Sequence, residues 1–276
     1  MDKMNRSFVV FFSSSKNIAA LASLAAVVAV LLLLFRWCGR EGEELSLYHI
    51  SQESVWSGVS LMGKERSVSA FSGDLLKALA EQQKVRFRVN MVPSRRELLA
   101  LLEEQEVDGV LTALEPSFAN KQKYLFSDPY LRLGDVLILR SSLPLRGFNE
   151  QATKLIGVHV SDLPILGLES QGNFEFRVYD NILNALTDLE QSKIDGAIFA
   201  AMPAYIYTRG FYDRQLKIAT TPLTQEGLRL VTLKGHRGEK IVQLFNDGLK
   251  SIQANGTYDR MIDQWGLVNP ERLDTQ

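Results

Sequence analysis

Histidine and cysteine, two residue types that often catalyse reactions or bind metal ions, are few in this sequence and far apart. The three histidines, His49, His159 and His236, are too scattered to indicate a metal site. The sequence contains no glycine-rich phosphate loop and no Ser-His-Asp order. The single cysteine, Cys38, cannot form an internal disulfide. The sequence therefore predicts no metal ion and no cofactor.

The composition is that of an ordinary folded protein. The chain has 276 residues, 46% of them hydrophobic, and its 31 Lys and Arg against 32 Asp and Glu give a net charge of −1 at pH 7. This length and apolar content predict one or two packed domains. Because the chain is nearly neutral, we expect no nucleic-acid partner.

The N-terminus indicates the compartment. Residues 18–35 form a run without a charge or a proline, at the lower limit of what crosses a hydrocarbon core as a helix. Lys and Arg are slightly more frequent before this run than after it, which favours an N-terminus in the cytoplasm and the rest of the chain outside it. The alternatives are an uncleaved anchor, a cleaved signal peptide and a lipoprotein signal ending at Cys38. The large residues at 35–37 favour the anchor.

From Leu45 onward, short apolar strands alternate with amphipathic helices, which predicts an α/β fold. The first unit consists of a strand, a helix, a strand, a helix and a strand, at Leu45–Ile50, Gly73–Gln82, Val85–Val92, Arg95–Glu104 and Asp108–Leu114. In its first helix, Leu75, Leu76 and Leu79 share one face, which is typical of packing on a sheet.

A second unit of the same kind follows the proline- and glycine-containing stretch 141–150. Its expected strands are Leu155–Val160, Phe174–Val178, Asp195–Ala200 and Leu216–Ala219, and its helices Ile182–Gln191 and Pro203–Thr208. A strand at Leu228–Leu233 and a long helix at Glu239–Gln253 follow. The segments VDGVLTA at 107–113 and IDGAIFA at 194–200 form a weak internal echo between the units.

Three segments together resemble the extracytoplasmic solute-binding proteins, family 3, of amino-acid type ABC transporters. They are FSGDLLKALAEQ at 71–82, LFSDPYL at 125–131 and ANGTYDRMIDQWGL at 254–267. The resemblance implies a two-lobed periplasmic-binding-protein type 2 fold, each lobe a mixed sheet flanked by helices, with two hinge crossings. It also implies that a small solute binds between the lobes, closes them, and is presented to an ABC permease rather than chemically altered.

The predicted domain organisation follows from this resemblance and from the N-terminal run. It comprises a cytoplasmic segment at 1–17, an anchor or signal at 18–35, a linker at 36–44, the first part of lobe 1 at 45–140, lobe 2 at 141–222 and the return to lobe 1 at 223–276. The bulk of the chain is expected in the periplasm or external space, tethered to the inner membrane.

Most of the family-like residues are predicted to be structural. Ser127 and Asp128 can bond nearby backbone donors in a turn. Tyr258 and Trp265 are expected to pack in the interior. Asp74 is expected near a helix N-terminus, where the helix dipole favours a negative charge.

The ligand-selecting positions differ from the family's pattern. Aligned on FSDPY, Asn120 stands where the family has an arginine that forks onto the ligand carboxylate, and Glu115 where a small hydroxyl residue is usual. Ala200 replaces the acidic residue for the ligand ammonium, and the loop that also contacts the carboxylate contains Ser161 and Asp162. The usual clamp for an α-amino acid is therefore expected to be missing.

Two main accounts fit these departures. In the first, Glu115 and Asp162 select a polar, nitrogen-containing solute such as a cationic amine, and Trp56 or Phe71 supplies an aromatic wall. In the second, the domain is a ligand-free interaction module of the envelope. A lesser alternative is a dehydratase for prephenate-like acids with Glu115 as general acid, but the missing arginine removes the partner of such a substrate. We expect the first account, with these candidate ligand-binding residues: Trp56, Phe71, Thr112, Glu115, Asn120, Ser161 and Asp162.

Overall fold

The computed structural model describes residues 45–54, 56, 59, 61–146, 148, 153–159 and 174–269. The expected anchor at 18–35 and the candidate residues Ser161 and Asp162 lie outside these ranges. Among the residues described, no helix is both long and apolar enough to cross a membrane.

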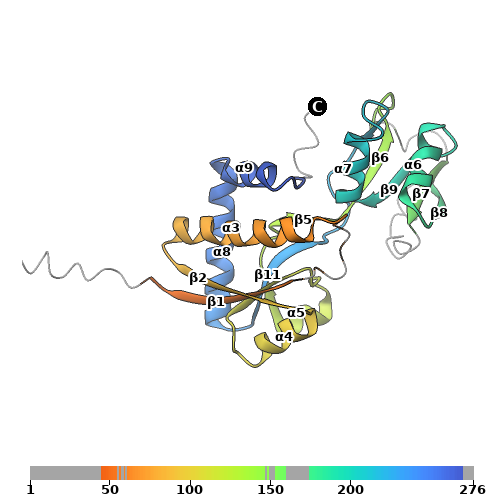
Figure 1. Cartoon of the computed structure of the whole chain (residues 1–276). Coiled ribbons are helices and arrows are strands. Elements are labelled where there is room, and N and C mark those ends of the chain that lie inside the picture. The colour runs from red at the N-terminus through yellow and green to blue at the C-terminus, as the bar shows by residue number, and fades with distance from the viewer. Residues whose placement is uncertain are drawn as a thin grey trace, which may run out of the picture. The chain divides into compact units, whose positions relative to one another are not determined.

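The first sheet forms the centre of lobe 1 (Figure 1). Its strand order is β2-β1-β3-β11-β4, and β5 also pairs with β11. The strands are β1 (Leu47–Glu53), β2 (Arg86–Val92), β3 (Gly109–Thr112), β4 (Tyr124–Phe126), β5 (Leu131–Arg132) and β11 (Gly227–Leu233). Strand β1 runs parallel to both β2 and β3, whereas β11 runs antiparallel to β3 and β4. The chain therefore returns to lobe 1 with a strand inside the sheet.

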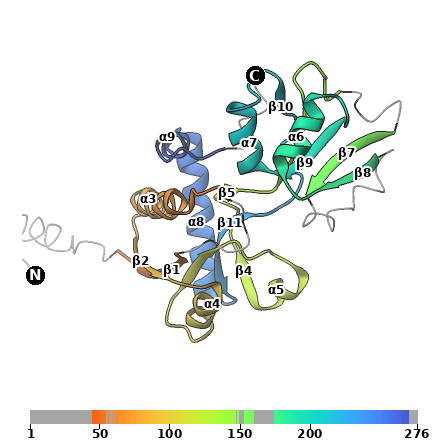
Figure 2. The same ribbon diagram turned by 45° about the vertical axis from the view of Figure 1, so that its right-hand side comes forward.

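Helices cover both faces of this sheet. They are α3 (Glu65–Gln83), α4 (Arg95–Glu103), α5 (Phe118–Lys123), α8 (His236–Ala254) and α9 (Thr257–Gln264). Ile50, Leu111 and Leu230 pack with α3 and α8, whereas Val110 and Val231 pack with α4. This division follows from the alternation of side chains along a strand. Figures 1 and 2 show α3 and α4 on opposite sides of β1 and β2.

The second sheet forms the centre of lobe 2 and has the strand order β10-β6-β9-β7-β8. Its strands are β6 (Asp135–Arg140), β7 (Lys154–His159), β8 (Phe174–Tyr179), β9 (Gly196–Ala200) and β10 (Leu216–Ile218), and its helices are α6 (Ile182–Glu190) and α7 (Ala201–Arg209). By sheet membership, lobe 2 begins at residue 135, because β6 pairs with β9.

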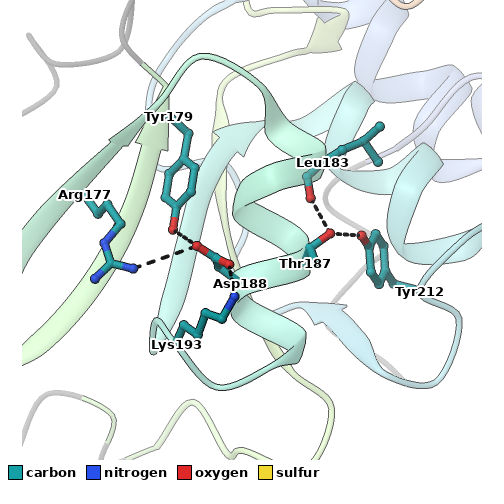
Figure 3. Close-up of polar contacts among 7 residues, drawn as sticks. All are labelled: Arg177, Tyr179, Leu183, Thr187, Asp188, Lys193 and Tyr212. Carbon is teal, nitrogen blue, oxygen red and sulfur yellow. Dashed lines mark hydrogen bonds and ion pairs between the residues drawn. The ribbon is translucent and has the colours of Figure 1, made fainter.

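A polar cluster ties α6 to β8 in lobe 2 (Figure 3). The Asp188 carboxylate accepts hydrogen bonds from the Tyr179 hydroxyl at 2.9 Å and from Lys193 Nζ at 3.1 Å. Arg177 Nη1 forms an ion pair with Asp188 Oδ2 at 3.8 Å. Hydrogen bonds from Lys193 and Tyr179 hold the pKa of Asp188 below its usual range, against the opposing effect of burial. These contacts fix the helix against its sheet.

The two lobes share one spatial order of strands. In each sheet three parallel strands are followed by one antiparallel strand, β11 or β6, and then by a strand antiparallel to that one, β4 or β10. The echo segments of the sequence become the third parallel strands, β3 and β9. The aspartate before each of these strands makes the same contact. Asp108 accepts from the backbone N–H of His49 at 2.8 Å, and Asp195 accepts from that of Leu155 at 2.9 Å. The echo therefore reflects a repeated structural requirement, a carboxylate that satisfies a donor on the neighbouring strand.

Asp108 carries an additional ion pair with Arg237, and this pair predicts a pH dependence of stability. Burial opposes ionisation of Asp108, but hydrogen bonds from Arg237 and His49 outweigh it and hold the pKa below its usual range. The stabilisation is therefore complete above an unfolded pKa of about 3.9 and is lost as the pH falls through the lower folded pKa. We expect Asp108→Asn to cost about 1 kcal/mol at pH 7 and less in acid. Urea unfolding at pH 7 and in acid checks this, and an equal loss at both would contradict it.

Helix α3 begins earlier than the sequence predicts, at Glu65 instead of Gly73. Val68 and Phe71 are fully buried in the extra turns, so tertiary packing outweighs the cost of a glycine inside a helix. The prediction that Asp74 lies near a helix N-terminus is consequently wrong. Its carboxylate accepts a hydrogen bond from the Trp265 indole N–H at 3.0 Å and thereby joins α3 to the segment after α9.

Two chain segments connect the sheets and are hydrogen-bonded to each other. The Leu133 N–H donates to the Glu226 carbonyl at 3.0 Å, and the Leu223 N–H donates to the Asp135 carbonyl at 2.7 Å. A Cβ atom on Gly134 would lie 2.5 Å from the Thr224 carbonyl oxygen, so only glycine permits this close approach. The two segments that connect the lobes are thus held side by side by backbone hydrogen bonds.

Candidate functional site

The candidate site lies where the parallel strands of lobe 1 end. In open α/β sheets, ligands bind outside the carboxyl ends of the strands. Here β1 ends at Glu53 and β3 ends at Thr112, and the loop after β3 contains Glu115. Strand β11 runs the other way, so its first residues lie at the same edge.

A buried carboxylate occupies this edge. The Glu53 side chain is fully buried, and its Oε1 accepts hydrogen bonds from Thr112 Oγ1 at 2.8 Å and from Arg95 Nε at 3.2 Å. Helix α4 positions Arg95 in its first turn, after an N-cap in which Ser94 Oγ accepts from the Glu97 N–H. Glu53 therefore orients Thr112 and belongs to an ion pair, and sequence patterning did not single it out.

Arg229 is a second buried charge at this edge. It pairs with Thr112 across β3 and β11 and is 5% exposed. Its Nη2 donates to the backbone carbonyl of Gln225, while its Nε–H has no hydrogen-bond acceptor within the described part of the chain. Burial lowers the pKa of Arg229, and the Arg132 guanidinium adds to this, whereas the carboxylates of Asp128 and Glu115 act in the opposite direction.

The two aromatic candidates lie in the hydrophobic core of lobe 1. Trp56 is 2% exposed, and its indole N–H donates to Ser69 Oγ at 2.9 Å. Phe71 is 0% exposed, with its ring centroid 6.2 Å from that of Tyr130 and 5.9 Å from that of Tyr258. In this structure both side chains pack among core residues instead of facing solvent.

The remaining candidates of lobe 1 lie together. Thr112 is buried at the end of β3, and Glu115 is exposed in the loop that follows. The Asn120 side chain donates to the Glu115 backbone carbonyl at 2.8 Å, and its N–H donates to Ser117 Oγ at 3.2 Å. Asn120 thus fastens the loop that presents Glu115. Because Glu115 is exposed, it lacks the burial that a general acid on this scaffold would need.

Ser127, Tyr258 and Trp265 have the structural roles that the sequence predicts. Ser127 Oγ accepts from the Leu230 N–H at 2.9 Å, and the Tyr258 hydroxyl donates to the Tyr130 carbonyl at 2.7 Å. Tyr258 is 4% exposed, and Trp265 packs against the same core. Within the described ranges, no group of three or more His, Cys, Asp or Glu side chains could hold a metal ion.

Comparison with known proteins agrees with this architecture. Residues 56–268 match the family of bacterial extracellular solute-binding proteins, family 3. A probable histidine-binding protein of Neisseria gonorrhoeae is 21% identical, covering 86% of this chain and 92% of its own length. The ABC transporter arginine-binding protein 1 of Escherichia coli K12 is 24% identical, covering 87% and 97%.

Solved structures show the same fold. The L-cystine solute receptor of Neisseria gonorrhoeae, in its unliganded open conformation, superposes with a TM-score of 0.59 at 18% identity, covering 80% of this chain and 93% of the receptor. Substrate-binding domain 2 of GlnP from Lactococcus lactis, also open, gives a TM-score of 0.56 at 17% identity, covering 80% and 96%.

These findings define the class of protein as a two-lobed solute-binding protein of type 2 fold, and the relatives compared are named as binding proteins. The chain belongs to family 3 of the bacterial extracellular solute-binding proteins.

Proposed function

We propose that this protein is the solute-binding component of an ABC importer and captures a small polar, nitrogen-containing solute, an amino acid or a cationic amine, between its two lobes. The observation that supports this most directly is the exposed carboxylate of Glu115, held by Asn120 on the loop at the ligand-binding edge of lobe 1. Relatives named as histidine-, arginine- and cystine-binding proteins point to solutes of this class.

In the proposed mechanism, the solute binds between the lobes, and the paired crossing segments bend as the lobes close. A permease then recognises the closed form. Ser161 and Asp162 contribute the lobe 2 side of the site, with Asp162 as a second carboxylate for a cationic group. Trp56 and Phe71 act on the site through the packing of lobe 1. Residues 18–35 tether the protein to the inner membrane, with the lobes outside the cytoplasm.

The test is a thermal-unfolding screen of the full-length chain in mild detergent against the standard amino acids, cystine and polyamines. A solute at about a hundred times its dissociation constant is expected to add roughly 2.7 kcal/mol of stability, which shifts the unfolding temperature measurably. As a control, each hit is repeated with Glu115→Gln, which removes the charge with little change in shape. Cationic hits that Glu115→Gln does not weaken would remove Glu115 from the site.

A ligand-free interaction module is the second candidate, favoured by one observation. Both aromatic side chains expected as a ligand wall are 2% exposed or less, so their rings are engaged in the core. Small-angle scattering separates the candidates, because a transported solute must close the lobes and reduce the radius of gyration. No compaction with any saturating solute would favour the module.

A further inference from the structure

The side chain that the site described above leaves least explained is Arg229. Buried polar groups in native proteins are almost always hydrogen-bonded, and a buried charge without full partners is costly. Arg229 is 5% exposed, yet its Nε–H has no acceptor in the part of the chain that the structure describes. This donor is therefore available to an acceptor outside the described part of the chain, such as a bound solute.

The position of Arg229 places its guanidinium at the ligand-binding edge. Arg229 pairs with Thr112, two residues from the paired Val231 and Val110, so it lies on the sheet face that α4 covers. Its Nη2 reaches back to the carbonyl of Gln225 in a crossing segment. The head of the side chain thus lies between the end of β3 and the hinge.

The carboxylates near Arg229 in the described part of the chain are not paired with it. Asp128 and Glu115 are near enough to affect its pKa, but among the described residues neither lies within hydrogen-bonding or ion-pairing distance of it. Arg132 adds a second positive charge nearby, on the strand that pairs with the start of β11. A guanidinium whose Nε–H has no acceptor can bind a carboxylate through two parallel hydrogen bonds.

We propose that Arg229, from β11, supplies the carboxylate-binding guanidinium of this site, in place of the arginine missing at position 120. This inference rests on the proposed solute-binding function and narrows it. With Glu115 on the neighbouring loop, the site presents one positive and one negative group. The solute is therefore a zwitterion that carries both a carboxylate and an amine, and a polyamine does not satisfy it.

The experiment uses pairs of solutes that differ only in a carboxylate: arginine and agmatine, histidine and histamine, lysine and cadaverine. Affinities for the full-length chain are measured by calorimetry, together with those of the remaining standard amino acids and cystine. At least one amino acid is expected to bind, and its decarboxylated partner is expected to bind about tenfold to a hundredfold more weakly, as for loss of hydrogen bonds to a charged group.

The decisive variant is Arg229→Met. It should weaken binding of the amino acid by the same factor as removal of the solute's carboxylate does, because the substitution and the decarboxylation remove the same interaction. The affinity for the decarboxylated amine should not change. Since the variant removes a buried charge whose Nε–H has no acceptor among the described residues, its unfolding temperature should equal or exceed that of the parent. Arg229→Lys keeps the positive charge but not the planar guanidinium, so its affinity for the amino acid should lie between those of the parent and of Arg229→Met. This second variant also keeps the test valid if Arg229→Met fails to fold.

Arg140 provides the matched control. It is a partly buried arginine of lobe 2 whose Nη1 donates to the carbonyls of Leu189 at 2.9 Å and Ile194 at 2.8 Å. Arg140→Met should lower stability and leave every solute affinity unchanged.

The outcomes separate this inference from the proposed function. If an amine binds as tightly as its amino acid, or if Arg229→Met and Arg229→Lys both bind the amino acid with parental affinity, the role of Arg229 is overturned while solute capture stands. If no amino acid and no amine binds, both are overturned.

Discussion

Replacing Phe71 by alanine is expected to destabilise lobe 1 by about 3–5 kcal/mol, the usual cost of deleting a fully buried aromatic ring. Phe71 is 0% exposed and packs against the rings of Tyr130 and Tyr258, which come from distant parts of the chain. The loss should lower the unfolding temperature by on the order of 10 °C, measured by calorimetry.

A conservative variant distinguishes this core role from the ligand-wall role that the sequence suggested. Phe71→Leu retains most of the apolar volume and should cost about 1 kcal/mol while leaving solute affinity unchanged. If Phe71→Leu remains as stable as the parent but loses affinity, the ring contacts solute and its assignment to the core is incomplete.

Replacing Arg95 by methionine is expected to cost roughly 3 kcal/mol, because it breaks the ion pair between Arg95 and the buried Glu53 carboxylate. The value is at the lower end for breaking a buried pair, since the Arg95 side chain is 30% exposed. Urea unfolding at neutral pH measures the change.

The double variant with Glu53→Gln tests the cause of this loss. Removing both charges should restore much of the stability, because the loss in Arg95→Met comes from breaking an ion pair of a buried carboxylate and not from lost packing. If the two single changes simply add, the pair contributes through packing alone. The introduced amide oxygen can still accept the hydrogen bond from the Thr112 hydroxyl, so the orientation of Thr112 is preserved in either case.

The alternating pattern of strands and helices was sufficient to predict the α/β class and two successive units, because burial on a sheet imposes a period that is visible in the sequence. The two-lobed arrangement came from the resemblance to the family. Strand β2 and helix α4 were located to within a residue or two. The start of α3 was missed because Val68 and Phe71 become helical only through packing on β1 and α8. Helix α5 was missed because it has six residues and no buried face, although Ser117 at its N-cap was a readable signal.

The site was predicted less completely, since its charges come together only through strand register. Glu53 is one of several polar residues in β1, and Arg229 is the one charged residue in the largely apolar β11. Nothing local in the sequence indicates that Glu53 contacts Thr112 from one side and Arg229 pairs with it from the other. Ranking the polar residues nearest the carboxyl ends of the predicted parallel strands would have identified Glu53. Arg229 lies on an antiparallel strand, and so it required the topology.

The interior position of β11 affects the order in which the protein can fold during synthesis. The strands and helices of lobe 2 are complete once residue 218 has left the ribosome, whereas the lobe 1 sheet lacks the strand between β3 and β4 until residue 233 is made. Helices α8 and α9, which cover one face of that sheet, emerge last. Lobe 2 is therefore expected to fold while the nascent lobe 1 still exposes apolar surface, so chaperones would be needed mainly for the half of the protein that is begun first.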